Sequence, residues 1–554
     1  MPSDPAARCI AVIGMGPRGL GALEALATRW PETAGVLGVD VFEADAVPGA
    51  GPNFDPDETP LCLLNTPLRD IDIPPPAFSH VGSFDMRLDA PADPDSFPTR
   101  AEIGRYLQER FEDLSAFARF DLRLIPARVE RLQAGDSGWE LVGDRGSHGP
   151  YAAVLLATGQ PPVAADDQWA RWQGHVARGM GELAQAYPAK QLIAAAEGWQ
   201  GRTVAIRGMG LSAFDVLRAL TVAQGGAFFD GQYLPSGREP ARILPFSLDG
   251  MPPYPKPETG ALDARFAAKV AETRIFDAAM AEASQSTPYT ARRLINAALI
   301  TPVTRILREA GEEEEAARVA DWLEAEWDAP GSQETTGPVD TLRHGIAMAE
   351  GATVPSIGYA VGQVWRRWQN HLRAGFNPVS PPGETSELIV GFDEGLKRYS
   401  YGPPIGSARE WLALADAGLV DMRLAIDPAF ALSETGWEMT CGAEEAQVDV
   451  MIDAVLPDPD ISIVTAPLIR SLRDAGVMVP VAEGLGAQTL SDGALVGAEG
   501  AAQEGLCLLG RLALGSVIAA DSLHDCLGAA ADRWAEGVID VLLGETEEVC
   551  DLAR

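Results

Sequence analysis

Three glycines near the start of the chain are spaced as in a turn that binds a dinucleotide. Gly14, Gly16 and Gly19 follow a short apolar run and surround Pro17 and Arg18, where a helical pattern begins. The first glycine of such a turn lets the chain leave the strand sharply, the second lets the backbone approach a pyrophosphate, and the third lets the helix pack on the sheet. The helix N-terminus adds unpaired N–H groups that favour phosphate. The spacing therefore predicts a dinucleotide site.

An acidic residue lies where this kind of site needs one. Residues 39–43 form a second apolar run that ends on Glu43, 24 residues after Gly19. A carboxylate at the end of that strand can accept hydrogen bonds from a ribose diol. The two runs and the helix between them predict the opening β-α-β unit of a parallel sheet.

A second glycine motif predicts a second dinucleotide site. An apolar run at 203–207 leads to Gly208, Gly210 and Ser212, with alanine at the third glycine position, which the motif tolerates. The motif begins about 195 residues after the first one, so FAD is expected at the first site and NADH or NADPH at the second. A buried strand between them ends in small residues that suit a crossover between two domains. These residues are Ala157, Thr158 and Gly159.

The elements around the two motifs predict an α/β fold with two Rossmann-like dinucleotide-binding domains and a helical insertion. Residues 44–100 are rich in Pro, Gly and Asp with little periodicity, which is typical of a long functional loop. A span rich in Ala, Glu and Arg follows the second motif and has helical periodicity. The expected parts are an FAD domain at 1–165 and 501–554, an NAD(P) domain at 166–257, a helical insertion at 258–385 and a return to the NAD(P) or substrate region at 386–500.

Composition excludes several classes of partner. The chain has 43 Lys and Arg against 79 Asp and Glu, a formal net charge of −36, which repels nucleic acid and anionic lipid. No apolar run reaches the roughly 18 residues of a membrane span, and the N-terminus has no basic leader, so a cytoplasmic protein is expected. The six histidines are far apart and the six cysteines contain no C-x-x-C pair. Neither a metal site nor a redox disulfide is therefore expected.

Several segments resemble a group of flavoproteins that includes bacterial FAD-dependent urate hydroxylases and nitrosuccinate-forming aspartate N-monooxygenases. The group is more distantly similar to the lysine and ornithine N-hydroxylases. The resemblance extends over residues 8–250 and resumes at about 395–535. The segments that carry it are 10–21, 63–67 (Leu-Leu-Asn-Thr-Pro), 156–159, 208–215 and 233–240.

The resemblance implies positions for the residues around the flavin. Asn65 and Thr66 would lie near the isoalloxazine ring. A closing segment would cover the ribityl and pyrimidine side, where its N–H groups could stabilise negative charge at the N1–C2=O edge. The cofactor residues expected in this segment are Gly510, Arg511, Ser516 and Asp521.

One departure from the group concerns the nicotinamide cofactor. Relatives commonly carry an arginine, after a serine, that grips the 2′-phosphate of NADPH at the strand end that follows the second glycine motif. Here Ser247 is followed by Leu248 and Asp249. Arg238 and Arg242, together with Arg207, are candidates to replace the missing arginine. An acidic residue suits a ribose 2′-hydroxyl as well, so NADH and NADPH both remain open.

The resemblance implies an FAD-dependent, NAD(P)H-using monooxygenase that hydroxylates the amine of a small amino acid, aspartate above all, through a C4a-hydroperoxyflavin. Two alternatives stay open: C-hydroxylation of a purine such as urate, and NAD(P)H-dependent reduction without oxygenation. The expected partners are a small-molecule substrate and O2, with a homo-oligomer possible. No residue is assigned to acid–base catalysis.

Two residues are candidates for binding the substrate. Arg366, next to Arg367, could hold a substrate carboxylate, although surface pairing with the many Glu residues is an alternative. Tyr401 belongs to an aromatic loop, 399–404, that is expected to line the active site.

Overall fold

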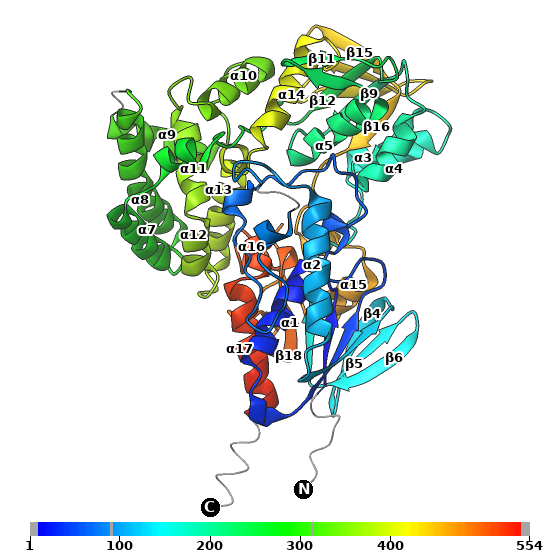
Figure 1. Ribbon diagram of the computed structural model, residues 1–554, viewed down its shortest axis with the longest axis vertical. Helices are drawn as coiled ribbons and strands as arrows, with labels where there is room; N and C mark the ends of the chain where they lie inside the picture. Colours follow the sequence, from blue (N-terminus) through cyan, green and yellow to red (C-terminus); the bar gives the residue numbers. More distant parts are fainter. Residues whose placement is uncertain (1–8, 89–91, 313–314, 545–554) are drawn as a thin grey trace, which may run out of the picture.

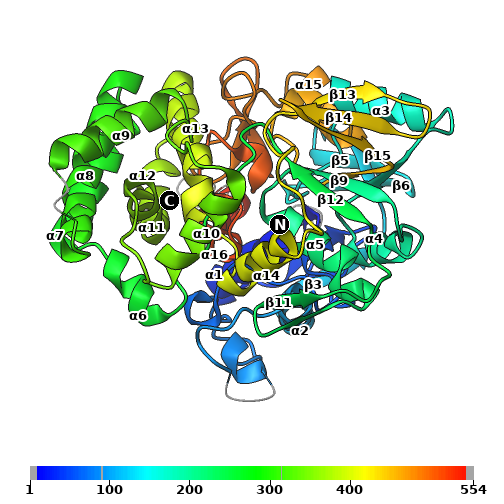
Figure 2. The same ribbon diagram turned by 90° about the horizontal axis from the view of Figure 1, so that it is seen from above.

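Two parallel β-sheets, one for each glycine motif, form the frame of the molecule. The computed structural model describes residues 9–88, 92–312 and 315–544. In Figure 1 the first sheet lies in the lower half of the molecule and the second lies at the top right. A region made of helices lies beside the second sheet, as Figure 2 shows from above.

The first sheet has six strands in the order β17-β18-β7-β1-β2-β3. The strands are parallel except β17, which pairs antiparallel with β18 at one edge. Two of the six come from near the end of the chain, so this domain is built from two separate segments. The strands are β1 (Cys9–Ile13), β2 (Leu37–Phe42), β3 (Phe120–Ile125), β7 (Ala153–Leu156), β17 (Ala494–Val496) and β18 (Ala502–Leu508).

The central strand β1 is apolar because both faces of this sheet are covered. Ile10 and Val12 pack against one face, under α1 (Pro17–Arg29), α2 (Arg100–Ser115) and α17 (Ala529–Leu543). Ala11 and Ile13 pack against the other face, under α15 and a three-stranded antiparallel sheet. Figure 1 shows α17 lying beside α1. The elements on the second face are β4 (Val129–Gly135), β5 (Gly138–Gly143), β6 (Gly146–Tyr151) and α15 (Pro467–Asp474).

The second sheet has four parallel strands in the order β12-β9-β16-β8. Helix α5 (Leu211–Leu220) follows β9 directly, as the second glycine motif predicts. Strand β16 enters the sheet only after the helical region, so this domain is discontinuous as well. The strands are β8 (Glu182–Gln185), β9 (Thr203–Arg207), β12 (Arg242–Phe246) and β16 (Val450–Asp453).

The helical region extends further than the expected insertion, because helices continue from Gly260 to Asp416. Aromatic stacking holds its core: Trp327 stacks on Phe392 and Phe276 on Trp368, with ring centroids 3.7 and 4.2 Å apart. The helices are α6 (Gly260–Asp263), α7 (Val270–Ala283), α8 (Pro288–Glu309), α9 (Ala316–Asp328), α10 (Pro338–Ala349), α11 (Ile357–Arg367), α12 (Gln369–Phe376), α13 (Gly383–Ser400) and α14 (Ile405–Asp416).

Smaller elements complete the fold. A three-stranded antiparallel sheet, β13-β14-β15, lies between the helical region and β16 in the chain. No helix within the described ranges combines the length and apolar character that crossing a membrane requires. The remaining elements are α3 (Asp167–Val176), α4 (Ala189–Ala196), β10 (Ala227–Phe229), β11 (Gln232–Leu234), β13 (Ala429–Leu432), β14 (Trp437–Cys441), β15 (Glu444–Val448) and α16 (Leu523–Cys526).

A buried ion pair joins α1, α2 and the long loop region of the first domain. Arg110 Nε and Nη2 donate to the two carboxylate oxygens of Glu24 at 2.9 and 2.6 Å. Arg110 Nη1 also donates to the Ile73 carbonyl at 2.8 Å. Both side chains are buried, and burial raises the pKa of the Glu24 carboxyl although Arg110 acts to lower it. The pair therefore depends on its two partners being present together.

We expect Arg110→Ala to destabilise the first domain by about 3–5 kcal/mol, because it leaves the Glu24 carboxylate buried without its cation. Urea unfolding followed by circular dichroism measures the loss. Arg105→Ala is the matched control: Arg105 lies on the exposed side of α2 and donates one hydrogen bond to Pro56 O, so about 1 kcal/mol is expected. Equal losses in the two variants would contradict the role assigned to the buried pair.

Candidate active site

One large cleft lies where the carboxyl ends of β1 and β9 meet the helical region. Its volume is about 2300 Å³, beyond the roughly 300–1,000 Å³ of a pocket for one drug-sized ligand. Both glycine motifs, the 157–159 crossover and residues from α11 and α13 line it. The cleft thus has room for two dinucleotides and a small substrate.

The first glycine motif forms a turn that other residues could not form. Gly14 has φ +93°, and a Cβ there would lie 2.5 Å from the Ala157 carbonyl oxygen. A Cβ at Gly19 would lie 2.4 Å from the Gly14 carbonyl oxygen, which gives this glycine the helix-packing role. Gly16 faces the cleft at the start of α1, where backbone N–H groups are available to phosphate.

Glu43 follows β2 and lines the same cleft. Its Oε2 accepts a hydrogen bond from the Met15 N–H at 2.9 Å, and its Oε1 accepts one from the Ala46 N–H at 3.1 Å. The carboxylate is therefore fixed beside the glycine turn. Contact with a ribose diol remains a prediction for this position.

The crossover between the domains contains an unsatisfied polar atom. Ala157, Thr158 and Gly159 line the cleft. The buried hydroxyl oxygen of Thr158 has no hydrogen-bond partner among the described residues, and buried polar groups are rarely left unpaired. This unpaired hydroxyl and the glycine turns lie on the same wall of the cleft, where they are available to bind polar groups of a cofactor.

The expected flavin residues differ in what they contact. Asn65 and Thr66 line the cleft. Arg18 also reaches it, but its guanidinium is engaged with Asp525 at 2.6 Å. Pairing of this kind ties α1 to the closing segment of the chain. A purely ligand-binding role for Arg18 therefore does not follow from its position.

In the closing segment, too, charged residues that line the cleft are paired with one another or with another part of the chain. Gly510, Arg511 and Asp521 line the cleft, and Arg511 Nη1 forms an ion pair with Asp521 at 2.8 Å. Asp521 also pairs with Lys397 from α13 at 2.8 Å. Ser516 is buried outside the cleft lining, where its hydroxyl accepts from the Thr489 N–H at 2.8 Å.

The second glycine motif repeats the geometry of the first. Gly208 has φ +99° and donates its N–H to the Phe246 carbonyl at 2.9 Å, as Gly14 does to Phe42. Gly210 has open space where a Cβ would stand. Gly208, Gly210 and Ser212 all line the cleft.

Two arginines expected at the nicotinamide nucleotide lie outside the cleft lining. Arg238 donates its Nε to the Gln224 carbonyl at 2.8 Å, and Arg242 is paired with Asp421 at 2.5 Å. Arg207 does line the cleft, but it is paired with Asp166 at 2.5 Å and Asp453 at 3.3 Å. The positions of Arg238 and Arg242 therefore do not support a contact with the nucleotide.

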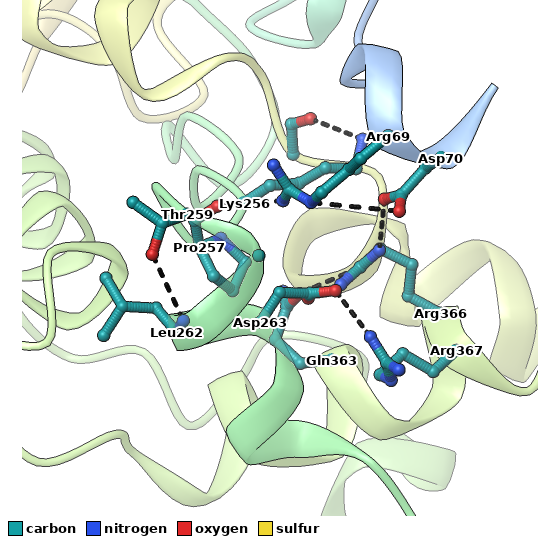
Figure 3. Close-up of polar contacts among 12 residues, drawn as sticks. Arg69, Asp70, Lys256, Pro257, Thr259, Leu262, Asp263, Gln363, Arg366 and Arg367 are labelled. Atoms are coloured by element: carbon teal, nitrogen blue, oxygen red, sulfur yellow. Dashed lines mark hydrogen bonds and ion pairs between the residues drawn. The ribbon is translucent and has the colours of Figure 1, made fainter. Parts of the chain in front are cut away.

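Four cationic side chains, those of Arg69, Lys256, Arg366 and Arg367, lie close together (Figure 3). Lys256 is only 6% exposed, and its Nζ donates to the backbone carbonyls of Asn65 and Gly402. Burial, reinforced by the nearby Arg366 guanidinium, lowers the pKa of Lys256 to about 7. No sequence motif marks this lysine. The one feature that could have drawn attention to it is that it is the single charged residue in the segment 251–257.

Three aspartates hold the arginines around Lys256, and Arg69 pairs with one of them, Asp95, at 2.5 Å. Asp263 pairs with both Arg366 and Arg367, the latter at 2.5 Å, and Asp70 lies 3.5 Å from Arg366. Asp70 also lies 3.9 Å from Arg69. Figure 3 shows these side chains converging from the 69–70 loop, α6 and α11. We call Lys256, Arg69, Arg366 and Arg367 the cationic group.

Tyr401 and Arg366 both line the cleft, as expected of substrate-binding residues. The Tyr401 hydroxyl donates to Gln369 Oε1 at 3.3 Å. The alternative expectation for Arg366, pairing at the surface with Glu, is wrong in its partner and its place, because the side chain is largely buried and its carboxylates are Asp263 and Asp70.

No cluster of His, Cys, Asp and Glu in the described ranges could hold a metal ion. Cys9, Cys62, Cys441, Cys507 and Cys526 are free thiols, and Cys550 lies outside the described residues.

Comparisons with known proteins bear on this site. Residues 11–161 match the FAD-NAD(P)-binding family. An L-aspartate N-monooxygenase (nitrosuccinate-forming) of Streptomyces davaonensis is 26% identical over 84% of this chain and 85% of its own length. A nitrosuccinic acid synthase of Aspergillus oryzae is 30% identical, but the match spans 45% of this chain and only 41% of that protein. Among solved structures, the L-lysine 6-monooxygenase of Pseudomonas syringae is 14% identical over 96% of this chain and 99% of its own, with a TM-score of 0.48.

Along most of its length the chain is similar to L-aspartate N-monooxygenases. This finding confirms the resemblance expected from the sequence. The description of the matching family, FAD-NAD(P)-binding, agrees with the cofactors expected from the sequence. The urate hydroxylase part of the expected group gains no support from these relatives.

We expect Gly14→Ala to lose FAD. A side chain at a positive φ costs about 1–3 kcal/mol, and the added methyl group would meet the Ala157 carbonyl, so FAD affinity falls at least about tenfold. The absorbance ratio of flavin to protein after purification measures the loss. Gly174→Ala is the control, because nothing lies within 4 Å of that position. Full flavin content in Gly14→Ala would refute the assignment of this turn to FAD.

Proposed function

We propose that the protein is an FAD-dependent, NAD(P)H-using monooxygenase that hydroxylates the amine of a small acidic amino acid, with aspartate as the preferred substrate. The observation that carries the substrate assignment is the cationic group beside Asn65. The homology to aspartate N-monooxygenases favours this function over purine hydroxylation and over reduction without oxygenation.

Protonated Lys256 supplies a positive charge that is in direct contact with no carboxylate among the described residues. The oxygens that accept from its Nζ are backbone carbonyls of Asn65 and Gly402, whereas the arginines around it are paired with aspartates. In a chain with a net charge of −36, an anionic substrate needs such a local concentration of cations. One carboxylate of a dicarboxylic amino acid would pair with Lys256, and the other would compete with Asp263 and Asp70 for Arg366.

When bound, FAD reduced by NAD(P)H supplies the activation of O2. The residues of this chain have other tasks. Asn65 and Thr66 form the wall that is expected beside the ring. The hydrogen bond from Lys256 to the Asn65 carbonyl holds the cationic group, which would bind the substrate carboxylates, against that wall.

Incubation of the FAD-loaded protein with aspartate, NADH or NADPH and oxygen-18 gas tests the proposal. We expect aspartate hydroxylated on nitrogen, with one labelled oxygen atom found by mass spectrometry. Asparagine is the matched control, because it has the same shape but one carboxylate fewer, and we expect it to react at least about tenfold more slowly. Oxidation of NAD(P)H that yields only peroxide, or that passes electrons to a dye without labelled amino acid, would contradict the proposal.

The pH dependence of succinate inhibition tests Lys256 separately. Succinate has both carboxylates and no amine, so its binding reports on the cations alone. Protonated Lys256 is lost as pH rises through about 7, so the inhibition constant should increase about tenfold between pH 7 and pH 9. We expect Lys256→Met to bind succinate about 10- to 100-fold more weakly at pH 6, with no further loss at higher pH.

Lys269→Met is the control for this experiment, because Lys269 is exposed at the start of α7. The control should keep both the affinity and the pH dependence of the unaltered protein. A flat pH profile in the unaltered protein, or unchanged affinity in Lys256→Met, would remove Lys256 from the substrate site.

A further inference from the structure

The two dinucleotide sites share one backbone geometry. Gly14 and Gly208 each donate an N–H to the last residue of the neighbouring strand, Phe42 and Phe246, at 2.9 Å. The strands pair in register, with Ile13 beside Phe42 and Arg207 beside Phe246. The residues that follow Phe246 therefore occupy the same place in the second site as Glu43 and its neighbours in the first.

The residues at the end of this strand determine whether such a site prefers NAD or NADP. In Rossmann-type sites, an acidic residue at the end of the second strand accepts hydrogen bonds from the ribose 2′-hydroxyl of NAD, and an arginine nearby accommodates the 2′-phosphate of NADP. Here the positions hold Ser247, Leu248 and Asp249, and all three line the cleft. Leu248 is 85% exposed and offers nothing to a phosphate.

Asp249 is held in position as a carboxylate. Its Oδ1 accepts from the Ser247 hydroxyl at 2.8 Å and from the Met251 N–H at 3.1 Å. Its Oδ2 lies 2.7 Å from Arg398 Nη2. The side chain is still 41% exposed, so its remaining lone pairs are accessible from the cleft.

Arg398 does not take over the missing phosphate contact. Its side chain is 18% exposed, and Nη2, the nitrogen that reaches outward, is paired with Asp249. Nε and Nη1 are buried, and Nη1 lies so close to Gly331 that a Cβ there would be 2.1 Å away. Arg398 lines the cleft as well, but the one guanidinium nitrogen that is not buried is already bound to Asp249.

Other charged residues near Asp249 also make this end of the cleft unfavourable for the 2′-phosphate of NADPH. Asp427 lines the cleft next to Ser247, to which its N–H is bonded at 2.9 Å. Arg207 is neutralised by Asp166 and Asp453. A 2′-phosphate would therefore meet Asp249 and Asp427 without a free cation among the described residues at this end of the cleft.

We propose that Asp249 selects NADH over NADPH by binding the adenosine ribose diol and repelling a 2′-phosphate. This inference rests on the proposed NAD(P)H-using function and names its electron donor. It departs from the arginine that relatives commonly carry at this strand end.

Calorimetric binding of 5′-AMP and 2′,5′-ADP to the FAD-loaded protein tests the assignment without turnover. The two probes differ only by the 2′-phosphate. We expect 5′-AMP to bind at least about tenfold more tightly, because juxtaposed like charges are strongly unfavourable. The ratio of kcat/KM for NADH and NADPH in flavin reduction should follow the same order. Tighter binding of 2′,5′-ADP would overturn the proposal.

Two variants make the test specific. Asp249→Asn keeps the shape of the side chain and should reduce the preference for 5′-AMP at least about fivefold. Leu248→Arg adds a cation at an exposed position and should bring 2′,5′-ADP binding level with 5′-AMP or above it. Asp230→Asn is the control, because Asp230 is exposed between β10 and β11 and lies outside the cleft lining. An unchanged preference in Asp249→Asn and Leu248→Arg would also overturn the assignment.

Failure of the proposed function would look different. If 5′-AMP is preferred and NADH reduces the flavin, but aspartate gains no oxygen, the donor assignment stands and the N-hydroxylation proposal falls. If aspartate is hydroxylated with NADPH preferred, only the donor assignment falls.

Discussion

Close backbone approach between Gly14 and Ala157 is the constraint on which the remaining arrangement depends. Because no Cβ stands between them, the ends of β1, β2 and β7 meet at one point, and the chain crosses from there toward the second domain. The cleft opens at this point and continues to the equivalent turn at Gly208. Two sites built on the same turn can then differ in ligand through the few residues that follow each second strand.

Positive charge is scarce in this protein, and most of it near the cleft is used for internal pairing. Arg18, Arg207 and Arg511 all reach the cleft, yet each is joined to an aspartate. Their contribution is to tie distant segments together, such as α1 with the closing segment. Lys256 differs because its partners are backbone carbonyls, which orient the ammonium group without neutralising it.

Local sequence predicts the parts of this structure that depend on local backbone geometry. The strand–turn–helix units at both glycine motifs are as expected, since turns and periodicity are properties of neighbouring residues. Side-chain partners are set by the tertiary fold instead. Arg18 meets a partner 507 residues away, and Arg242 has the right residue type but faces away from the cleft. Lys256 has no periodic pattern around it, so only the folded chain reveals its burial.

The order of strands in the first sheet has a consequence for how the protein is made. Strand β1 and strand β18 are separated only by β7 in the sheet, but by almost the whole chain in sequence. During synthesis, domains fold as their segments emerge, and here the first part of the sheet stays without β18 and α17 until residues 502–543 have been made. Long-range pairing of this kind closes slowly. The first sheet is therefore complete only after β18 has been made, and until then the apolar edge of β7 stays exposed.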